Sequence, residues 1–274
     1  MATASPERPL LQSAIAIVAG IGLGAGGLLL GFLLTAVVGA VLVYGLGLTV
    51  SPALSIVLGL VFVQGIGCGG VAFAYRGARP RIAPPVRSRL GLSGDGPTFD
   101  IPASMPSLRD LLVVAGGYGT ALVGAIVGSA VLSSLQVDTG TNRAAEIGMQ
   151  NPEVLLVLIP ASFLLIGPGE ELLFRGVVQG RIREVFDPIP GVVLPSVVFA
   201  GLHWVALSGG SPLGNLAALG VLLVPAHVFG AAYEYTGNIV VPSLIHGAYN
   251  ATLFTLLYVV VRFGDQLPQS ALLA

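Results

Sequence analysis

Long runs of hydrophobic residues, separated by short polar segments, make up most of the chain. The stretch from Leu10 to Tyr75 contains no charged residue, and it is about three times as long as the ~20 residues that a helix needs to cross a bilayer. Because every backbone polar group inside lipid must be hydrogen-bonded within the protein, the pattern predicts helical spans. Polar residues, proline and glycine then mark where each span ends.

This pattern predicts seven spans, within a range of six to eight. The number of spans depends on the first one, because the glycine-rich segment Gly20–Gly27 could divide one long helix into two. The predicted ranges are Leu11–Leu48, Ala53–Tyr75, Leu108–Leu135, Glu153–Val185, Gly191–Leu207, Leu213–Tyr235 and Ile239–Val261. The predicted fold class is therefore an all-α integral membrane protein, a polytopic transmembrane helix bundle.

Composition supports this class. Of the 274 residues, 54% are hydrophobic and only 9% are charged, with a mean hydropathy of +0.91, whereas average soluble domains carry about 25% charged residues. We therefore expect membrane lipid as a partner and a multi-pass location in the cell membrane. The net charge of -1 gives no sign of a nucleic-acid partner.

One segment differs from the rest and suggests both orientation and domain boundaries. Residues 76–106 are rich in Pro, Gly and Ser, and five arginines lie between Arg76 and Arg89. The segment predicts an extended loop, and its arginines place that loop in the cytoplasm. In a seven-span chain the N-terminus is then cytoplasmic and the 136–152 linker external. We expect an N-terminal region at 1–106, with two or three spans and this loop, and a second helix bundle at 107–265 that holds the candidate functional residues described next.

Three charges follow an apolar run in GPGEELLFRG. A charge at mid-bilayer costs about 2.5–3.5 kcal/mol on insertion scales, so such groups face a protein interior or a water-filled cavity. Glu171 and Arg175 have the i,i+4 spacing of an ion pair. Glu170 lies about 100° around the helix and lacks a cation on its own helix, so it is a candidate general base. The alternative is that the three charges only hold helices together.

Two further polar groups lie in later spans. In FAGLHW, His203 stands alone on an apolar face, where a packing role is the commoner interpretation. In LIHGAYN, His246 and Asn250 are spaced i,i+4 and project together into the bundle. We expect one polar cavity, open to the cytoplasm, that is lined by Glu170, His203, His246 and Asn250, with Arg175 bound to Glu171 behind it.

Taken in order, EELLFR, FAGLH and HGAYN match the pattern EExxxR, FxxxH and HxxxN. The chain thereby resembles the CAAX protease and bacteriocin-processing (Abi) family of intramembrane endopeptidases, including CAAX prenyl protease 2-like enzymes. The resemblance covers about residues 152–260 and implies hydrolysis of a peptide bond in a membrane-associated peptide or lipidated protein. It implies the following catalytic roles: Glu170 activates water, Glu171 and Arg175 hold Glu170 in place, His203 orients the water or stabilises charge, and His246 with Asn250 supports the oxyanion.

The sequence leaves metal dependence open. Glu170, His203 and His246 form a legitimate zinc set, yet they lie on three helices and the chain lacks HExxH. We expect either no cofactor or one zinc ion, and we favour a metal-independent mechanism. Two functions of other classes remain: a proton-coupled transporter or ion pathway that uses the buried Glu, His and Arg, and a non-enzymatic membrane partner protein. A transporter of common type would show an inverted repeat with paired broken helices, and the sequence shows none.

Overall fold

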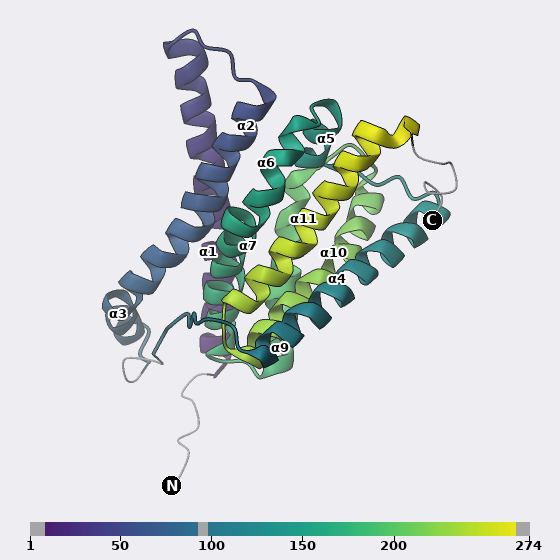
Figure 1. Cartoon of the computed structure of the whole chain (residues 1–274). Helices are drawn as coiled ribbons and strands as arrows, with labels where there is room; N and C mark the ends of the chain where they lie inside the picture. The colour runs from purple at the N-terminus through teal and green to yellow at the C-terminus, as the bar shows by residue number, and fades with distance from the viewer. Residues whose placement is uncertain (1–8, 93–97, 267–274) are drawn as a thin grey trace.

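The computed structural model describes residues 9–92 and 98–266, which form a helix bundle with one short β-ribbon (Figure 1). Seven helical segments in this described part are long and apolar enough to cross a membrane. They are Leu10–Gly45, Pro52–Arg89, Leu108–Ser134, Glu153–Arg183, Pro188–Ala206, Pro212–Thr236 and Val240–Gln266. The prediction of an all-α polytopic bundle of about seven spans is confirmed.

The first span is one continuous helix. α1 (Pro9–Ala40) passes directly into the π-helical stretch η1 (Val41–Gly45), so the glycine-rich segment does not divide it. Within that segment Gly27 allows close packing against the second span, and Gly20 and Gly24 lie against Val178 of the fourth span. A Cβ added to Gly27 would lie 2.5 Å from the backbone oxygen of Gly67, and small residues at such crossings are typical of membrane helices.

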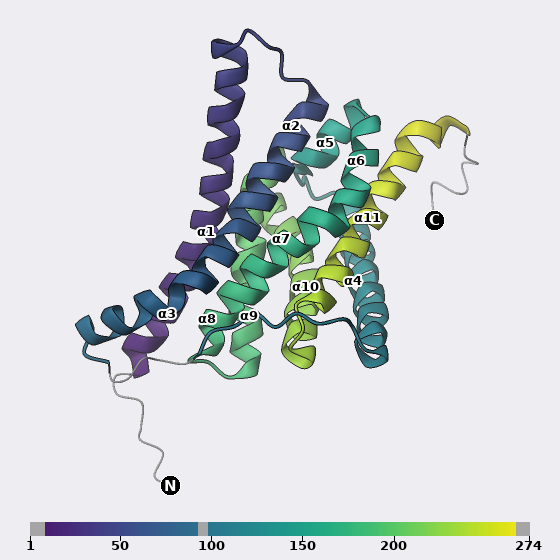
Figure 2. The same ribbon diagram turned by 60° about the vertical axis from the view of Figure 1, so that its left-hand side comes forward.

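The second span continues further than the sequence predicts. It consists of α2 (Pro52–Gly59), the π-helical stretch η2 (Leu60–Gly70) and α3 (Val71–Arg89). The arginine-rich stretch up to Arg89 is therefore helical, and the prediction of an extended loop there is wrong. α3 bends outward at one end of the bundle (Figure 2).

Tertiary contacts explain why this proline-containing segment is helical. Arg79 of α3 is buried and binds Glu184 at 2.9 Å, an interaction that a sequence pattern does not reveal. After Leu92 the described chain resumes at residue 98 and runs without regular structure to α4, with Ile101 buried against Gly176.

The remaining spans pack around the fourth. Their elements are α4 (Leu108–Ser134), α6 (Glu153–Ala161), the π-helical stretch η3 (Ser162–Ile166), α7 (Gly167–Glu171), the π-helical stretch η4 (Leu172–Gln179), α8 (Gly180–Arg183), α9 (Pro188–Leu202), the 3₁₀ turn η5 (His203–Ala206), α10 (Pro212–Thr236), α11 (Val240–Phe263) and the 3₁₀ turn η6 (Gly264–Gln266). α4 packs against α10 and α11. Gly128 of α4 lies so close to Val221 of α10 that an added Cβ would approach the valine side chain to 2.7 Å.

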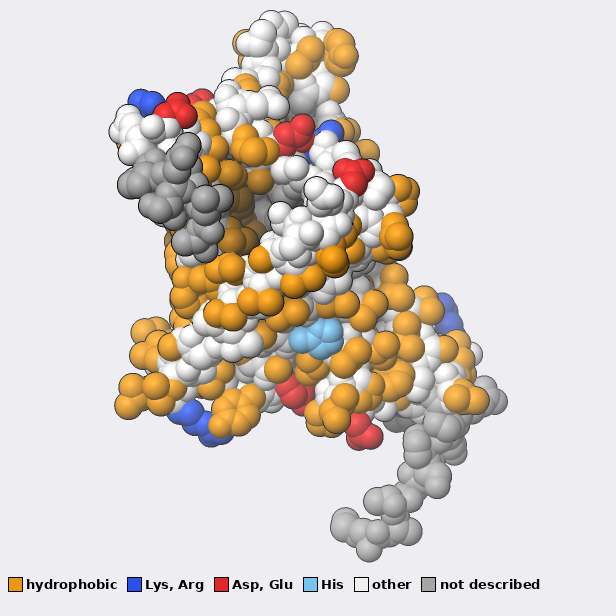
Figure 3. Space-filling view, turned by 90° about the vertical axis from the view of Figure 1, so that its right-hand side faces the viewer, with side chains coloured by type: hydrophobic (Ala, Val, Ile, Leu, Met, Phe, Trp, Pro, Cys, Tyr) orange, Lys and Arg blue, Asp and Glu red, His pale blue; other side chains and the backbone are white. Residues whose placement is uncertain are grey.

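Polar and charged groups gather at the two ends of the bundle. At one end β1 (Thr141–Asn142) pairs antiparallel with β2 (Leu207–Ser208), and α5 (Arg143–Gln150) follows β1. At the other end Arg76 binds Asp100 at 2.7 Å. The Ile101 backbone amide and Arg76 together hold the pKa of the Asp100 carboxyl below its usual value. Figure 3 shows hydrophobic side chains covering the middle of one face, between these charged ends.

Candidate active site

The fourth span is shaped for close approach by two other helices. π-Helical stretches lie on both sides of α7, and such wider turns often occur at functional sites. A Cβ on Gly167 would lie 2.7 Å from the backbone oxygen of Ser243 in α11, and one on Gly169 would lie 2.5 Å from that of Gln64 in η2. The GPG of the motif therefore lets α7 sit between the second and the last span.

Glu171 and Arg175 form a fully buried ion pair. Glu171 Oε2 and Arg175 Nε are 3.1 Å apart, and both side chains are 0% exposed. The contact is an ion pair by distance without hydrogen-bond alignment. Arg175 also donates from Nη2 to the Ala226 carbonyl at 3.2 Å and lies over the Phe199 ring at 4.7 Å. The pair spaced i,i+4 in the sequence thus neutralises Glu171 inside the bundle.

Glu170 points away from this pair toward three other elements. Its Oε1 accepts a hydrogen bond from Gln64 Nε2 at 2.8 Å. Its Oε2 lies 3.9 Å from His203 Nε2 and 3.9 Å from His246 Nε2, within the 5–6 Å that one bridging water allows. This oxygen is buried and makes no hydrogen bond to any described residue. The structure therefore brings Glu170, His203 and His246 together from three spans.

The hydrogen bonds of both histidines fix which ring nitrogen carries the proton. Nδ1 of His203 is 2.8 Å from the carbonyl oxygen of Phe199, which only accepts, so Nδ1 donates. Nδ1 of His246 is 2.8 Å from Glu171 Oε1 and likewise donates to the carboxylate. In the neutral rings each Nε2 then carries a lone pair and lies 3.9 Å from Glu170 Oε2. Three acceptor atoms converge on one buried point, which calls for a hydrogen-bond donor or a cation between them.

Access to this point is uneven. The His203 side chain is 25% exposed, against 9% for Glu170 and 5% for His246. His203 begins η5, where α9 ends, whereas His246 stacks on Phe229 with ring centroids 4.7 Å apart. A substrate would therefore approach from the His203 side, with His246 at the closed back of the site.

Two further polar side chains, Asn250 and Gln64, lie near the site. Asn250 is half-buried one turn beyond His246 and hydrogen-bonds to no described residue, so its place in the site stays a prediction. Gln64 was not among the predicted residues, although it contacts Glu170 directly. One signal could have found it: it is the sole amide side chain between Ser13 and Tyr75.

The donor set suits a zinc ion in type, although the spacing is wide. Metal-bound histidines usually donate their second N–H to a carboxylate or carbonyl, as both histidines do here. Two ligands at ~2.0–2.1 Å from a tetrahedral zinc lie about 3.4 Å apart, whereas two ~2.8 Å hydrogen bonds to one water span about 4.5 Å. The observed 3.9 Å lies between these values. Within residues 9–92 and 98–266, no group of three or more His, Cys, Asp or Glu is arranged to hold a metal.

Fold and site together define a class: a multi-pass membrane protein with a buried carboxylate and two imidazoles that face a shared point. Residues 152–252 match the family model described as type II CAAX prenyl endopeptidase Rce1-like. This match, over residues 152–252, supports the CAAX protease family that the motifs indicate, and with it a peptidase in general. No curated protein and no solved structure matches it.

Proposed function

We propose that the chain is an intramembrane endopeptidase that hydrolyses a peptide bond in a membrane-associated protein, with prenylated CAAX-type proteins as the substrate class. The observation that carries this proposal is the convergence of Glu170 Oε2 with the Nε2 atoms of His203 and His246 at 3.9 Å each. A water molecule at that point could donate its two hydrogen bonds to two of these three acceptor atoms.

Glu170 is the general base of this mechanism. As the water oxygen attacks the scissile carbonyl carbon, one water proton moves to Glu170 Oε2, which makes no hydrogen bond to a described residue. The carbonyl π bond breaks and its electrons move to the oxygen, giving a tetrahedral oxyanion. Glu170 then passes the proton to the departing amine as the C–N bond breaks. The products are an amine and a carboxylic acid, and Glu170 is again a carboxylate.

The oxyanion needs donors on the opposite side from the base. The Asn250 amide supplies N–H groups one turn beyond His246. His246 can donate from Nε2 only when it is protonated, and Glu171, 2.8 Å from Nδ1, stabilises that imidazolium. Nε2 of His203 accepts a hydrogen bond from the second O–H of the water and thereby orients it, while that proton stays on the oxygen. These roles are those that the family resemblance implies, assigned residue by residue.

Two further groups hold the base in position. Gln64 fixes Oε1 of Glu170 and leaves Oε2 turned toward the histidines, so we assign it as a positioning residue from the half of the chain outside the family match. Arg175 balances the charge of Glu171. Without Arg175, two adjacent carboxylates would lie buried together at a high electrostatic cost.

We propose a metal-independent reaction. If a zinc ion is bound, Glu170, His203 and His246 would hold it, and it would supply Lewis acidity and lower the pKa of a bound water. In either case Gln64 positions Glu170, the Phe199 carbonyl positions His203, and Glu171 positions His246.

The test uses the full chain, purified and reconstituted into vesicles. It compares a prenylated CAAX peptide with the same peptide without lipid, and mass spectrometry of the products locates the cleaved bond. We expect cleavage of the prenylated peptide that persists in a metal chelator. Loss of activity in chelator, restored by zinc, would overturn the metal-independent route. Failure to cleave either peptide, by protein shown to be folded, would contradict the proposed substrate class.

A further inference from the structure

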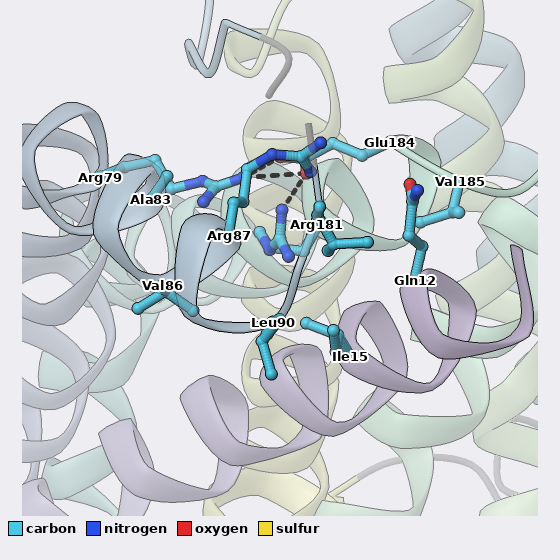
Figure 4. Close-up of a pocket in the computed structure, with 11 residues that line it drawn as sticks. Gln12, Ile15, Arg79, Ala83, Val86, Arg87, Leu90, Arg181, Glu184 and Val185 are labelled. Atoms are coloured by element: carbon cyan, nitrogen blue, oxygen red, sulfur yellow. Dashed lines mark hydrogen bonds and ion pairs between the residues drawn. The ribbon is translucent and has the colours of Figure 1, made fainter. Parts of the chain in front are cut away.

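A second polar site lies at the end of the bundle where the first, second and fourth spans meet. A cavity of about 70 Å³ opens there between α1, α3 and α8 (Figure 4). Its lining includes Ile15, Arg79, Ala83, Val86, Arg181 and Glu184. A site that holds one water needs about 10–15 Å³ by this measure, so the cavity has room for a group the size of a phosphate.

Positive charge is in excess inside this cavity. Arg79 is 8% exposed and Arg181 is 7% exposed, and both bind the same Glu184 carboxylate. These two arginines share one carboxylate, which leaves one positive charge among the three side chains. The Nε atoms of Arg79 and Arg181 are buried without a hydrogen-bond partner among the described residues. Guanidinium N–H groups left in this way match the several acceptor oxygens of an anion.

The opposite wall of the cavity is apolar. Ile15, Val86 and Leu90 line it, and Val86 is also 48% exposed on α3 next to the lipid-facing surface. The cavity lies at the ends of three membrane spans, which is the depth of lipid headgroups. A ligand with an anionic head and an apolar body fits both walls, whereas a free anion would contact only the basic one.

We propose that this cavity binds the phosphate of an anionic phospholipid, with Arg79 and Arg181 as its principal donors. The phosphate oxygens accept from the guanidinium groups, and an acyl chain follows the apolar wall past Val86. Lipid bound there would join α3 to the fourth span, which also carries Glu170 of the proposed active site.

Native mass spectrometry of the delipidated full chain measures the proposed binding. Phosphatidylglycerol, phosphatidylcholine and inorganic phosphate are added separately at matched concentrations. We expect one phosphatidylglycerol to be retained at least tenfold more strongly than phosphatidylcholine. Arg79→Gln and Arg181→Gln should each reduce that preference about tenfold. Arg81→Gln is the matched control, because Arg81 lies on the same helix but is exposed and donates to the Gly77 carbonyl.

A cavity-filling variant covers the case in which loss of a buried arginine prevents folding. Ala83→Leu keeps every arginine but occupies the space beside them, and it should also abolish retention of phosphatidylglycerol. Equal retention of the two lipids would overturn the proposal. So would a loss of the phosphatidylglycerol preference in Arg81→Gln as large as in the other variants, because basic residues in general would then explain the binding. Retention of inorganic phosphate as strong as that of phosphatidylglycerol would overturn the assignment to lipid.

Discussion

Replacing Arg175 by methionine should destabilise the protein by about 3–5 kcal/mol. Both side chains of the Glu171–Arg175 pair are 0% exposed, so solvent does not screen the charge that remains, and removal of one partner from a buried pair costs about that much. Methionine approximates the length of the aliphatic stem, which limits the contribution of a cavity. The hydrogen bond from Arg175 to the Ala226 carbonyl adds to the loss.

A double-mutant cycle separates the ion pair from the other contacts of Arg175. We expect Glu171→Gln and Arg175→Met each to lower the free energy of unfolding, and the double variant to lose at least ~2 kcal/mol less than the sum of the two. Unfolding in mixed micelles, followed by circular dichroism, gives the four values. Strict additivity would refute the view that the two charges stabilise each other.

Three further outcomes follow from the packing around Glu170 and from the distribution of arginine. Gln64→Leu should lower kcat about 10- to 100-fold with little change in KM, because Glu170 loses the hydrogen bond that positions it while no substrate contact is removed. An unchanged kcat would contradict the role of Gln64 as a positioning residue. Gly169→Ala should cost about 1–3 kcal/mol by overpacking, whereas Gly201→Ala, with nothing within 4 Å of the added Cβ, should not; equal effects would contradict the packing argument. In a cysteine-free background, Arg81→Cys should react with impermeant reagent only from the cytoplasmic face, and labelling only from outside would reverse the orientation.

Span number and position followed from the sequence because lipid imposes a simple rule. Each apolar run of sufficient length had to be a helix, and punctuation such as Ser107 or Gly237 marked the ends. α3 did not follow the rule because Arg79, in the segment whose prolines and arginines signal a loop, is buried and pairs with Glu184, about 100 residues away. The first span is one helix in which Gly27 packs closely against Gly67 of the second span, a contact that no local pattern contains.

The sequence predicted the site residues that lie in motifs, and no others. The i,i+4 spacing predicted the contact of Glu171 with Arg175, and the ordered motifs predicted that His203 and His246 approach Glu170. The contact of His246 with Glu171 and the role of Gln64 depend on how three helices cross. A single amide in an apolar run was the only trace of Gln64 in the sequence.

Glu170→Gln tests the central claim most directly. The amide keeps the shape of the side chain and can still accept from Gln64, but it cannot take a proton from water. A general base contributes about 10²–10⁴-fold, so single-turnover cleavage of a peptide that the wild type cleaves should fall by at least 100-fold. Glu153→Gln, an exposed position at the start of the same span, is the matched control and should cleave at the wild-type rate. Cleavage by folded Glu170→Gln protein within tenfold of the wild-type rate would contradict the assignment of Glu170 as the base.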